Sequence, residues 1–203
     1  MQQPAKESLL KVYLVNETSN QVRFNELTDV ELVISLLTNR LSSDGDDRPL
    51  RSLYSIRAIK YPQHLGQDEE LSEIIWLDNE STICDLVQKF GLKVDTCRFE
   101  LRIRYFLFTF REILDRDRVT FYYLYDQIKS DYFKTKKPVD QETAINLCCL
   151  EIRRFFKDIT QFALEKKSNY EFLEKEIGLH KFIPSRIISS VKVTFQTLKF
   201  RNS

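Results

Sequence analysis

The chain has 203 residues, and its 31 basic and 30 acidic side chains leave a net charge of +1. This balance excludes a global field that would draw the chain to nucleic acid or anionic lipid, so an electrostatic partner has to be held by a local patch. Hydrophobic residues at 42% and aromatic residues at 12%, with only 4 Gly and 5 Pro, are typical of an ordered globular protein.

Targeting and catalytic signals are sparse. No apolar run approaches the roughly 20 residues of a membrane-spanning helix, and the first 15 residues lack a signal-peptide pattern, so we expect a soluble, intracellular protein. The four cysteines have no CxxC spacing and accompany only two histidines, which predicts reduced thiols and no zinc site. The sequence also lacks P-loop, dinucleotide, nucleophile-elbow and HExxH motifs. We therefore expect a non-enzyme without a cofactor.

The first half of the chain mixes strand and helix patterns. Thr28 is a candidate cap for a helix with apolar residues at helical spacing up to Leu41. A shorter helix begins after Thr82 and ends at Gly91. Strands are expected at 9–15, 21–24, 53–60, 73–77 and 99–106. The order strand, strand, helix, strand, strand, short helix, strand is that of a ubiquitin-like β-grasp.

The second half has helical periodicity only. Helices are expected at 119–133, at 139–158 after the cap candidate Asp140, from Ser168 or Asn169 to a stop at Gly178, and at 184–191. The boundary between the halves is placed near 106–112. The sequence thus predicts an α+β protein with a ubiquitin-like lobe at 8–106, an all-α helical bundle at 112–191 and a tail at 192–203.

Basic side chains gather in the helical half. These side chains can contact phosphates or an acidic partner, but each pair taken alone is better explained as ordinary helix surface or loop charge. The aromatic residues follow core periodicity instead of interleaving with a basic groove, which argues against a nucleic-acid partner. The basic candidates are Arg153, Arg154, Lys166, Lys167 and Lys192.

Five stretches carry a family resemblance: WLDNESTICDLVQKF, FELRIRYF, DRVTFYYLYDQIKSDYF, CLEIRRFFKD and ALEKKSNYEFLEKEIGLHKFIP. They resemble the FERM region of the focal adhesion kinase and proline-rich tyrosine kinase family. The likeness is loose over 9–71 and close from Trp76 to Pro184. It implies the first two lobes of a FERM domain, the second being a bundle like that of acyl-CoA-binding protein, followed by a divergent tail in place of the third lobe.

The resemblance implies regulation by docking. In that family the FERM region folds back on the tyrosine kinase domain through an apolar patch of its second lobe and inhibits the kinase. Carried over residue by residue, this patch falls on Phe156, Ile159, Asn169, Phe172 and Leu173.

The same resemblance implies further partners and locations. A lysine-rich segment that binds phosphoinositides follows the second lobe in the family, but only Lys192 of it is kept here; the other four basic candidates match a cluster that supports nuclear entry. The implied partners are a tyrosine kinase domain, adhesion receptor tails or adaptor proteins, and a weak phosphoinositide contact. The implied locations are the cytoplasm, focal adhesions, the cell cortex at the plasma membrane and the nucleus. The alternative is a scaffold that links receptor tails or membrane to the cytoskeleton without kinase control.

Residue spacing alone leaves two interpretations of the docking patch. Phe172 and Leu173 point about 100° apart on a helix, so both cannot share the stripe that Ile177 continues. In one interpretation Leu173 and Ile177 are core while Phe172 faces outward as an anchor for a partner. In the other, all three are core.

Overall fold

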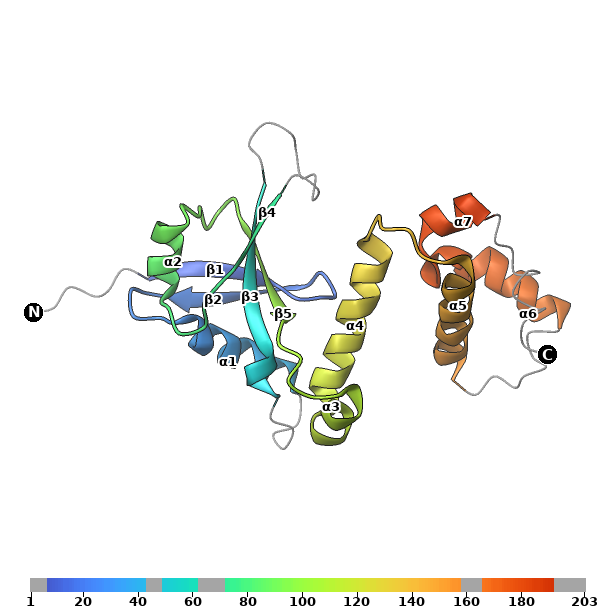
Figure 1. The fold of residues 1–203 in the computed structure, drawn as a ribbon, viewed down its shortest axis with the longest axis horizontal. Helices are drawn as coiled ribbons and strands as arrows, with labels where there is room; N and C mark the ends of the chain where they lie inside the picture. Colours follow the sequence, from blue (N-terminus) through green and yellow to red (C-terminus); the bar gives the residue numbers. More distant parts are fainter. Residues whose placement is uncertain (1–6, 43–48, 62–71, 158–165, 192–203) are drawn as a thin grey trace, which may run out of the picture. The chain divides into compact units, whose positions relative to one another are not determined.

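A computed structural model describes residues 7–42, 49–61, 72–157 and 166–191 of the chain (Figure 1). The chain divides into two compact units, Met1–Lys129 and Ser130–Ser203. Among the described helices, none is both long and apolar enough to cross a lipid bilayer.

The first unit is built on a mixed five-stranded sheet with the order β2-β1-β5-β3-β4. β1 pairs antiparallel with β2 and parallel with β5, while β3 pairs antiparallel with both β4 and β5. The strands are β1 (Ser8–Tyr13), β2 (Ser19–Phe24), β3 (Tyr54–Lys60), β4 (Glu73–Trp76) and β5 (Arg98–Ile103). The α+β fold class is therefore confirmed, although β5 ends at Ile103 and not at residue 106.

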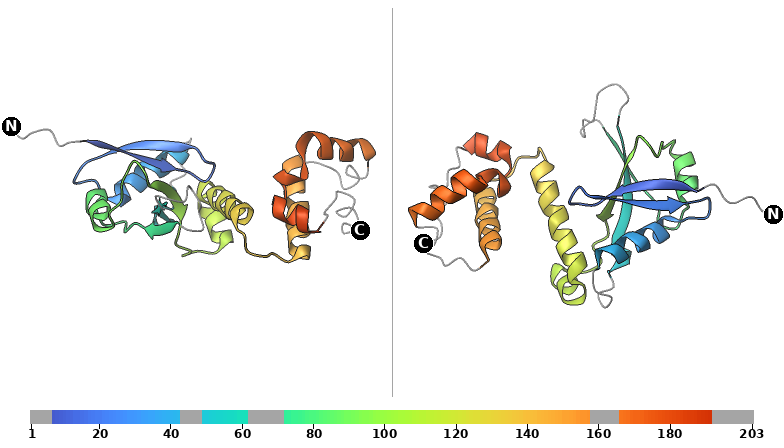
Figure 2. Two further views of the ribbon diagram at one scale, coloured as in Figure 1. Left: turned by 90° about the horizontal axis from the view of Figure 1, so that it is seen from above. Right: turned by 180° about the vertical axis from the view of Figure 1, so that it is seen from behind.

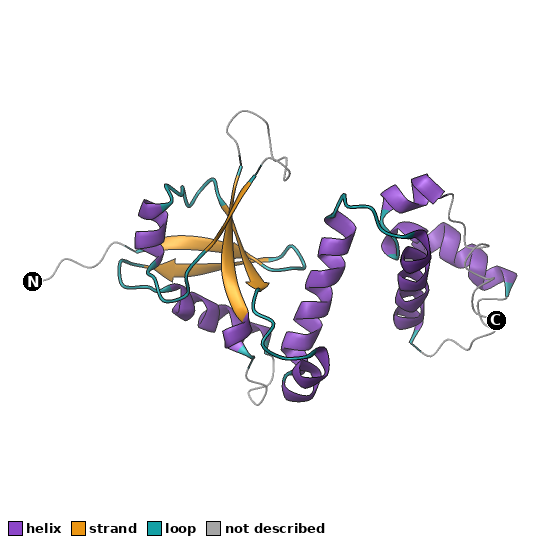
Figure 3. Ribbon diagram, in the orientation of Figure 1, coloured by secondary structure: helices purple, strands orange, loops and turns teal. Residues whose placement is uncertain are grey.

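The core of the first unit lies between the sheet and its helices. The alternation in β1 sends Leu10 and Val12 inward, where they are fully buried, and leaves Leu9 and Lys11 on the opposite face. The helix α1 (Val30–Leu41) covers the inner face with a buried stripe that includes Val33. Figures 2 and 3 show α1 and the short α2 (Ile83–Lys89) beside the sheet.

The cap of α1 differs from the prediction. Asp29, not Thr28, is the N-cap, and its carboxylate accepts a hydrogen bond from Leu32 N–H at 2.6 Å. Thr28 is instead held by the preceding turn, where its hydroxyl bonds to the side chain of Asn25. The cap of α2 is Thr82, as predicted.

Two helices follow the sheet in the chain. The first, α3 (Phe110–Arg116), was not predicted, although Thr109 and Glu112 form a capping box of the kind that marks a helix start in sequence. The next, α4 (Arg118–Lys134), contributes Tyr123 and Leu124 to the core of the first unit. The division between the units falls inside α4, at a different place from the boundary expected near 106–112, and the two lobe ranges stay a prediction.

The second unit has a smaller, separate core. Besides the end of α4, the unit contains α5 (Gln141–Phe156), α6 (Lys167–Phe172), a π-helical turn at Leu173–Ile177, a 3-10 turn at Leu179–Lys181 and α7 (Ser185–Val191). Asp140 caps α5 as predicted, and Gly178 ends the π-helical turn with a φ of 80°. The buried residues are Ala144, Ile145, Cys148, Ile152, Ile177, Phe182, Ile183 and Ile187.

Candidate functional site

The docking patch expected in the second unit is described in part. Phe172 ends α6 and is 52% exposed, whereas Ile177 is buried in the core. Asn169 is half-buried on the same helix, and its N–H donates to the carbonyl of Lys166 at 3.1 Å. Ile159 lies outside the described residues, and the side chain of Leu173 does as well. The outward position of Phe172 agrees with the anchor interpretation; its role in docking stays a prediction.

The structure gives Phe156 a different setting from Phe172. Phe156 is half-buried and packs against the core of the second unit, while its neighbour Phe155 is 53% exposed. The two rings meet edge-to-face with 5.0 Å between centroids, and Phe155 also meets the buried ring of Phe182 at 5.6 Å. The described contacts of Phe156 are thus with Phe155 and the core of the second unit.

An exposed apolar stripe on α5 was missed in the sequence. Leu147 is 39% exposed and Leu150 is 62% exposed. They lie three residues apart and therefore share a face of the helix, opposite the buried residues Ile145, Cys148 and Ile152. A helical projection of α5 would have shown this, because Ile145, Cys148 and Ile152 form one apolar face and the two leucines fall on the opposite one.

The basic candidates lie beside these apolar residues in the chain. Arg153 and Arg154 are exposed in the last turn of α5, where positive charge is favoured by the helix dipole. Lys166 is exposed just before α6. Lys192 and the side chain of Lys167 lie outside the described part of the chain. The arginines therefore have a structural explanation, and a binding role for them stays a prediction.

The cysteine in the core of the second unit is a packing residue. Cys148 is fully buried, and burial, assisted by the neighbouring Cys149, raises the pKa of its thiol to about 12. The thiol is therefore protonated at neutral pH and behaves as a small apolar side chain. Among the described residues, no group of three or more His, Cys, Asp or Glu side chains is placed to hold a metal ion.

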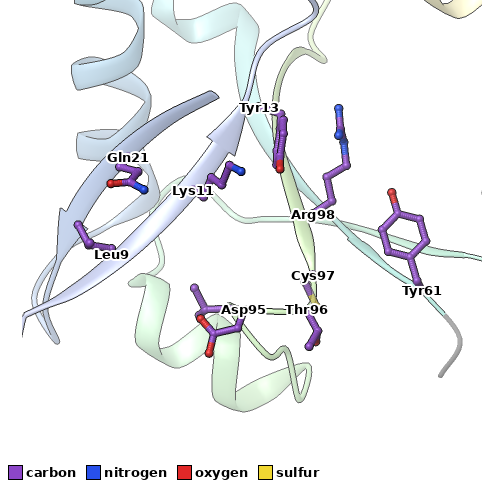
Figure 4. A pocket seen from close by; sticks show the side chains of 10 residues that line it. Leu9, Lys11, Tyr13, Gln21, Tyr61, Asp95, Thr96, Cys97 and Arg98 are labelled. Carbon is purple, nitrogen blue, oxygen red and sulfur yellow. The ribbon is translucent and has the colours of Figure 1, made fainter. Parts of the chain in front are cut away.

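A groove of about 470 Å³ in the first unit was also missed (Figure 4). It lies between the outer face of β1 and the turn before β5, where Lys11 and Arg98 both approach the ring of Tyr13, at 4.8 and 4.0 Å from its centroid. Arg98 also forms ion pairs with Glu17 and Glu100. The groove has the size of a ligand pocket but a mixed-charge lining, which suits polar side chains of a partner. Its full lining is Leu9, Lys11, Tyr13, Gln21, Tyr61, Val94, Asp95, Thr96, Cys97 and Arg98.

Part of the chain is similar in sequence to known proteins. Residues 112–197 match the FERM central domain. The mouse (Mus musculus) protein "FERM and PDZ domain-containing protein 1" is 26% identical over 188 residues, which cover 91% of this chain and 11% of that protein. The chain thus spans about a tenth of the length of this curated relative.

Solved structures share the fold at low sequence identity. The myosin VII MyTH4-FERM MF2 domain of Dictyostelium discoideum (mutant 1) has a TM-score of 0.64 and 14% identity over 97% of this chain and 38% of its own. The C-terminal MyTH4-FERM domain of human myosin 7b, in complex with the harmonin-a PDZ3 domain, has a TM-score of 0.54 and 17% identity over 97% of this chain and 36% of its own. These solved structures show a shared fold, and the match to the FERM central domain concerns residues 112–197.

Proposed function

We propose that the chain is a non-catalytic FERM-type scaffold module that binds partner proteins, with the ring of Phe172 as an anchor. The observation that carries this proposal is the exposure of Phe172, at 52%, within the region that matches the FERM central domain. Aromatic side chains of this kind contribute much of the binding energy when a partner pocket removes them from water.

Two proteins of the same fold were solved together with another protein domain, and this supports a protein domain as the partner. The human myosin 7b domain was solved with a PDZ domain, and the Drosophila merlin FERM domain was solved with a C-terminal domain, at a TM-score of 0.51 to this chain. We propose that this chain likewise binds folded protein domains, in the cytoplasm and close to the membrane or the cytoskeleton.

The test compares two aromatic truncations of matched exposure, 52% at Phe172 and 54% at Tyr122 in the first unit. Proximity labelling in cells identifies the neighbours of the wild type, of Phe172→Ala and of the control Tyr122→Ala, and each candidate partner is then titrated with the purified chain. We expect Phe172→Ala to weaken direct binding at least tenfold, about 1.4 kcal/mol, while Tyr122→Ala keeps it. Equal affinities of all three chains for every purified partner would refute the role of Phe172.

A second candidate partner is a tyrosine kinase domain of the focal adhesion type. The exposure of Phe172 favours it, because this residue lies where the sequence resemblance puts the kinase-docking patch. The curated relative is a FERM and PDZ domain protein, so we place the general scaffold first.

The kinase hypothesis has a direct assay. The purified chain is titrated into an isolated focal-adhesion-type kinase domain, and autophosphorylation is followed with the wild type and with Phe172→Ala. Inhibition by the wild type alone supports kinase docking. Unchanged autophosphorylation in both titrations rules out inhibition in trans and leaves the scaffold function as the proposal.

A further inference from the structure

The exposed face of α5 has the residue spacing of a coiled-coil seam (Figure 1). Thr143, Leu147, Leu150 and Arg154 follow one another at intervals of four, three and four residues, which keeps them on one side of a helix. All four side chains are exposed, and the two leucines are 39% and 62% exposed. The buried residues of α5 lie on the opposite side. We call these four residues the α5 seam.

The two ends of α5 carry opposite charges beside the seam. Asp140 and Glu142 are exposed at the start of the helix, whereas Arg153, Arg154 and Lys157 are exposed at its end. Glu142 and Arg153 are eleven residues apart, about three turns of helix, so both lie on the same flank of the seam. This surface therefore has an apolar middle, an acidic end and a basic end.

A second copy of α5 that runs antiparallel to the first is complementary to this surface. A two-fold axis at the middle of the seam places Leu147 of each copy opposite Leu150 of the other, because the two residues are equally far from the centre. The same axis brings Glu142 of each copy beside Arg153 of the other. A parallel arrangement would instead place like charges together at both ends, which costs binding free energy.

We propose that the chain forms an antiparallel homodimer through the α5 seam. The leucines supply the apolar contact, and the two Glu142–Arg153 pairs set the direction of the helices. The seam is short, so we expect a transient dimer with a Kd on the order of 10 to 100 µM. This inference goes beyond the proposed protein-binding function: a dimer presents two Phe172 rings, and two linked sites bind a partner with two matching sites more tightly than one site does.

Sedimentation equilibrium of the purified chain over a range of concentrations measures the self-association. The seam variant is Leu147→Gln/Leu150→Gln, because glutamine keeps the helix propensity of leucine. The matched control is Leu32→Gln/Leu36→Gln, which removes two leucines of 49% and 38% exposure from one face of α1. We expect the wild type and the control to dimerise with the same Kd, and the seam variant to have a Kd at least tenfold higher.

An exchange of charges tests the antiparallel direction. Glu142→Arg and Arg153→Glu should each raise the Kd about tenfold, because each variant brings like charges together at both ends of its homodimer. An equal mixture of the two variants should form a heterodimer with a Kd close to that of the wild type, since both ends then regain opposite charges. Recovery in the mixture also excludes a folding defect in either variant. Parallel helices would leave each single variant as strong as the wild type.

Four results would overturn the proposal. The first is a wild type that stays monomeric at every concentration, which would leave the seam to a different protein. The second is an equal Kd for the seam variant and the wild type, and the third is a charge mixture no stronger than either variant alone. The fourth is a urea midpoint of the monomeric seam variant below that of the control, which would show that the leucines pack within their own chain. Phe172→Ala should dimerise as the wild type does, so a failed dimer and a failed protein-binding test are distinguishable.

Discussion

The side chain of Gln127 closes the open edge of β5, and this contact yields the sharpest prediction for the fold. Gln127 is 6% exposed on α4, its Oε1 accepts from Ile103 N–H at 2.8 Å, and its Nε2 donates to the Ile103 carbonyl at 2.9 Å. The amide thus satisfies both backbone groups of one residue, as a neighbouring strand would. Tyr123 adds a third bond of this kind, from its hydroxyl to the carbonyl of Leu101 at 2.8 Å.

Gln127→Met should destabilise the chain by about 2 to 4 kcal/mol. Methionine has a similar volume, so the substitution leaves little cavity, but it removes both partners of Ile103. Each buried backbone group without a partner lowers the free energy of unfolding by about 1 to 3 kcal/mol. Part of this loss is offset, because the polar amide of glutamine no longer has to be removed from water on folding. Urea denaturation of the purified chain measures the effect as a lower midpoint.

Gln127→Glu adds a pH dependence with a defined sign. The protonated carboxyl can donate to the Ile103 carbonyl and accept from its N–H, as the amide does, whereas the ionised form places a buried charge beside that carbonyl oxygen. The folded pKa of the introduced carboxyl therefore rises above its unfolded value of about 4.3. The penalty is absent below that pH and grows as the pH increases toward the folded pKa.

Two outcomes would contradict this account of Gln127. One is a urea midpoint for Gln127→Met that matches the wild type. The other is a stability difference between Gln127→Glu and the wild type that stays constant between pH 4 and pH 7. Measuring the difference at each pH removes the titration of other groups from the comparison.

Three further predictions concern single positions. Burial opposes ionisation of Glu100, but Arg57 and Arg98 outweigh it and hold the pKa of its carboxyl below the usual range. The resulting stabilisation is present above about pH 4.5 and is lost as the pH falls through the lower folded pKa. Glu100→Gln should therefore lose less stability than the wild type between about pH 7 and pH 3, measured by urea denaturation at each pH. Gly178→Ala should lower the melting temperature, because a Cβ at φ 80° would lie 2.6 Å from the His180 ring, at a cost of about 1 to 3 kcal/mol; an unchanged transition would refute the strain. Asp140→Ala should remove about 1 kcal/mol with the α5 cap, and Asp140→Asn, which can still cap, should restore most of it in the same melt.

Most of the β-grasp was predictable because its signals are local. The apolar alternation of the strands, the stripe of α1 and the Thr82 cap each lie within a few residues, and the structure keeps all of them. The error at the start of α1 is also local: Thr28 and Asp29 are adjacent and both can cap. Asp29 is the cap because the Thr28 hydroxyl is already hydrogen-bonded to the side chain of Asn25 in the preceding turn. Helix propensities do not include such a bond.

The surfaces were less predictable than the core. The groove around Lys11 and Arg98 needs β1 and β5 to be parallel neighbours, a pairing between segments about 85 residues apart that alternation alone does not specify. The exposed residues that follow β5 were missed for another reason. Strand-like alternation continues past Ile103 into residues 104–106, so those residues were assigned to the last strand when the structure presents them to solvent.

The pair Phe155 and Phe156 shows why a docking hypothesis should be tested first at Phe172. The sequence resemblance assigns docking to Phe156, but adjacent residues on a helix point about 100° apart, and the structure gives the exposed position to Phe155. The ring of Phe156 packs against the core of the second unit, so its truncation removes apolar contacts that stabilise the fold. A loss of binding in Phe156→Ala would therefore report unfolding as readily as a lost contact. Phe172 is 52% exposed, so its truncation separates the two effects.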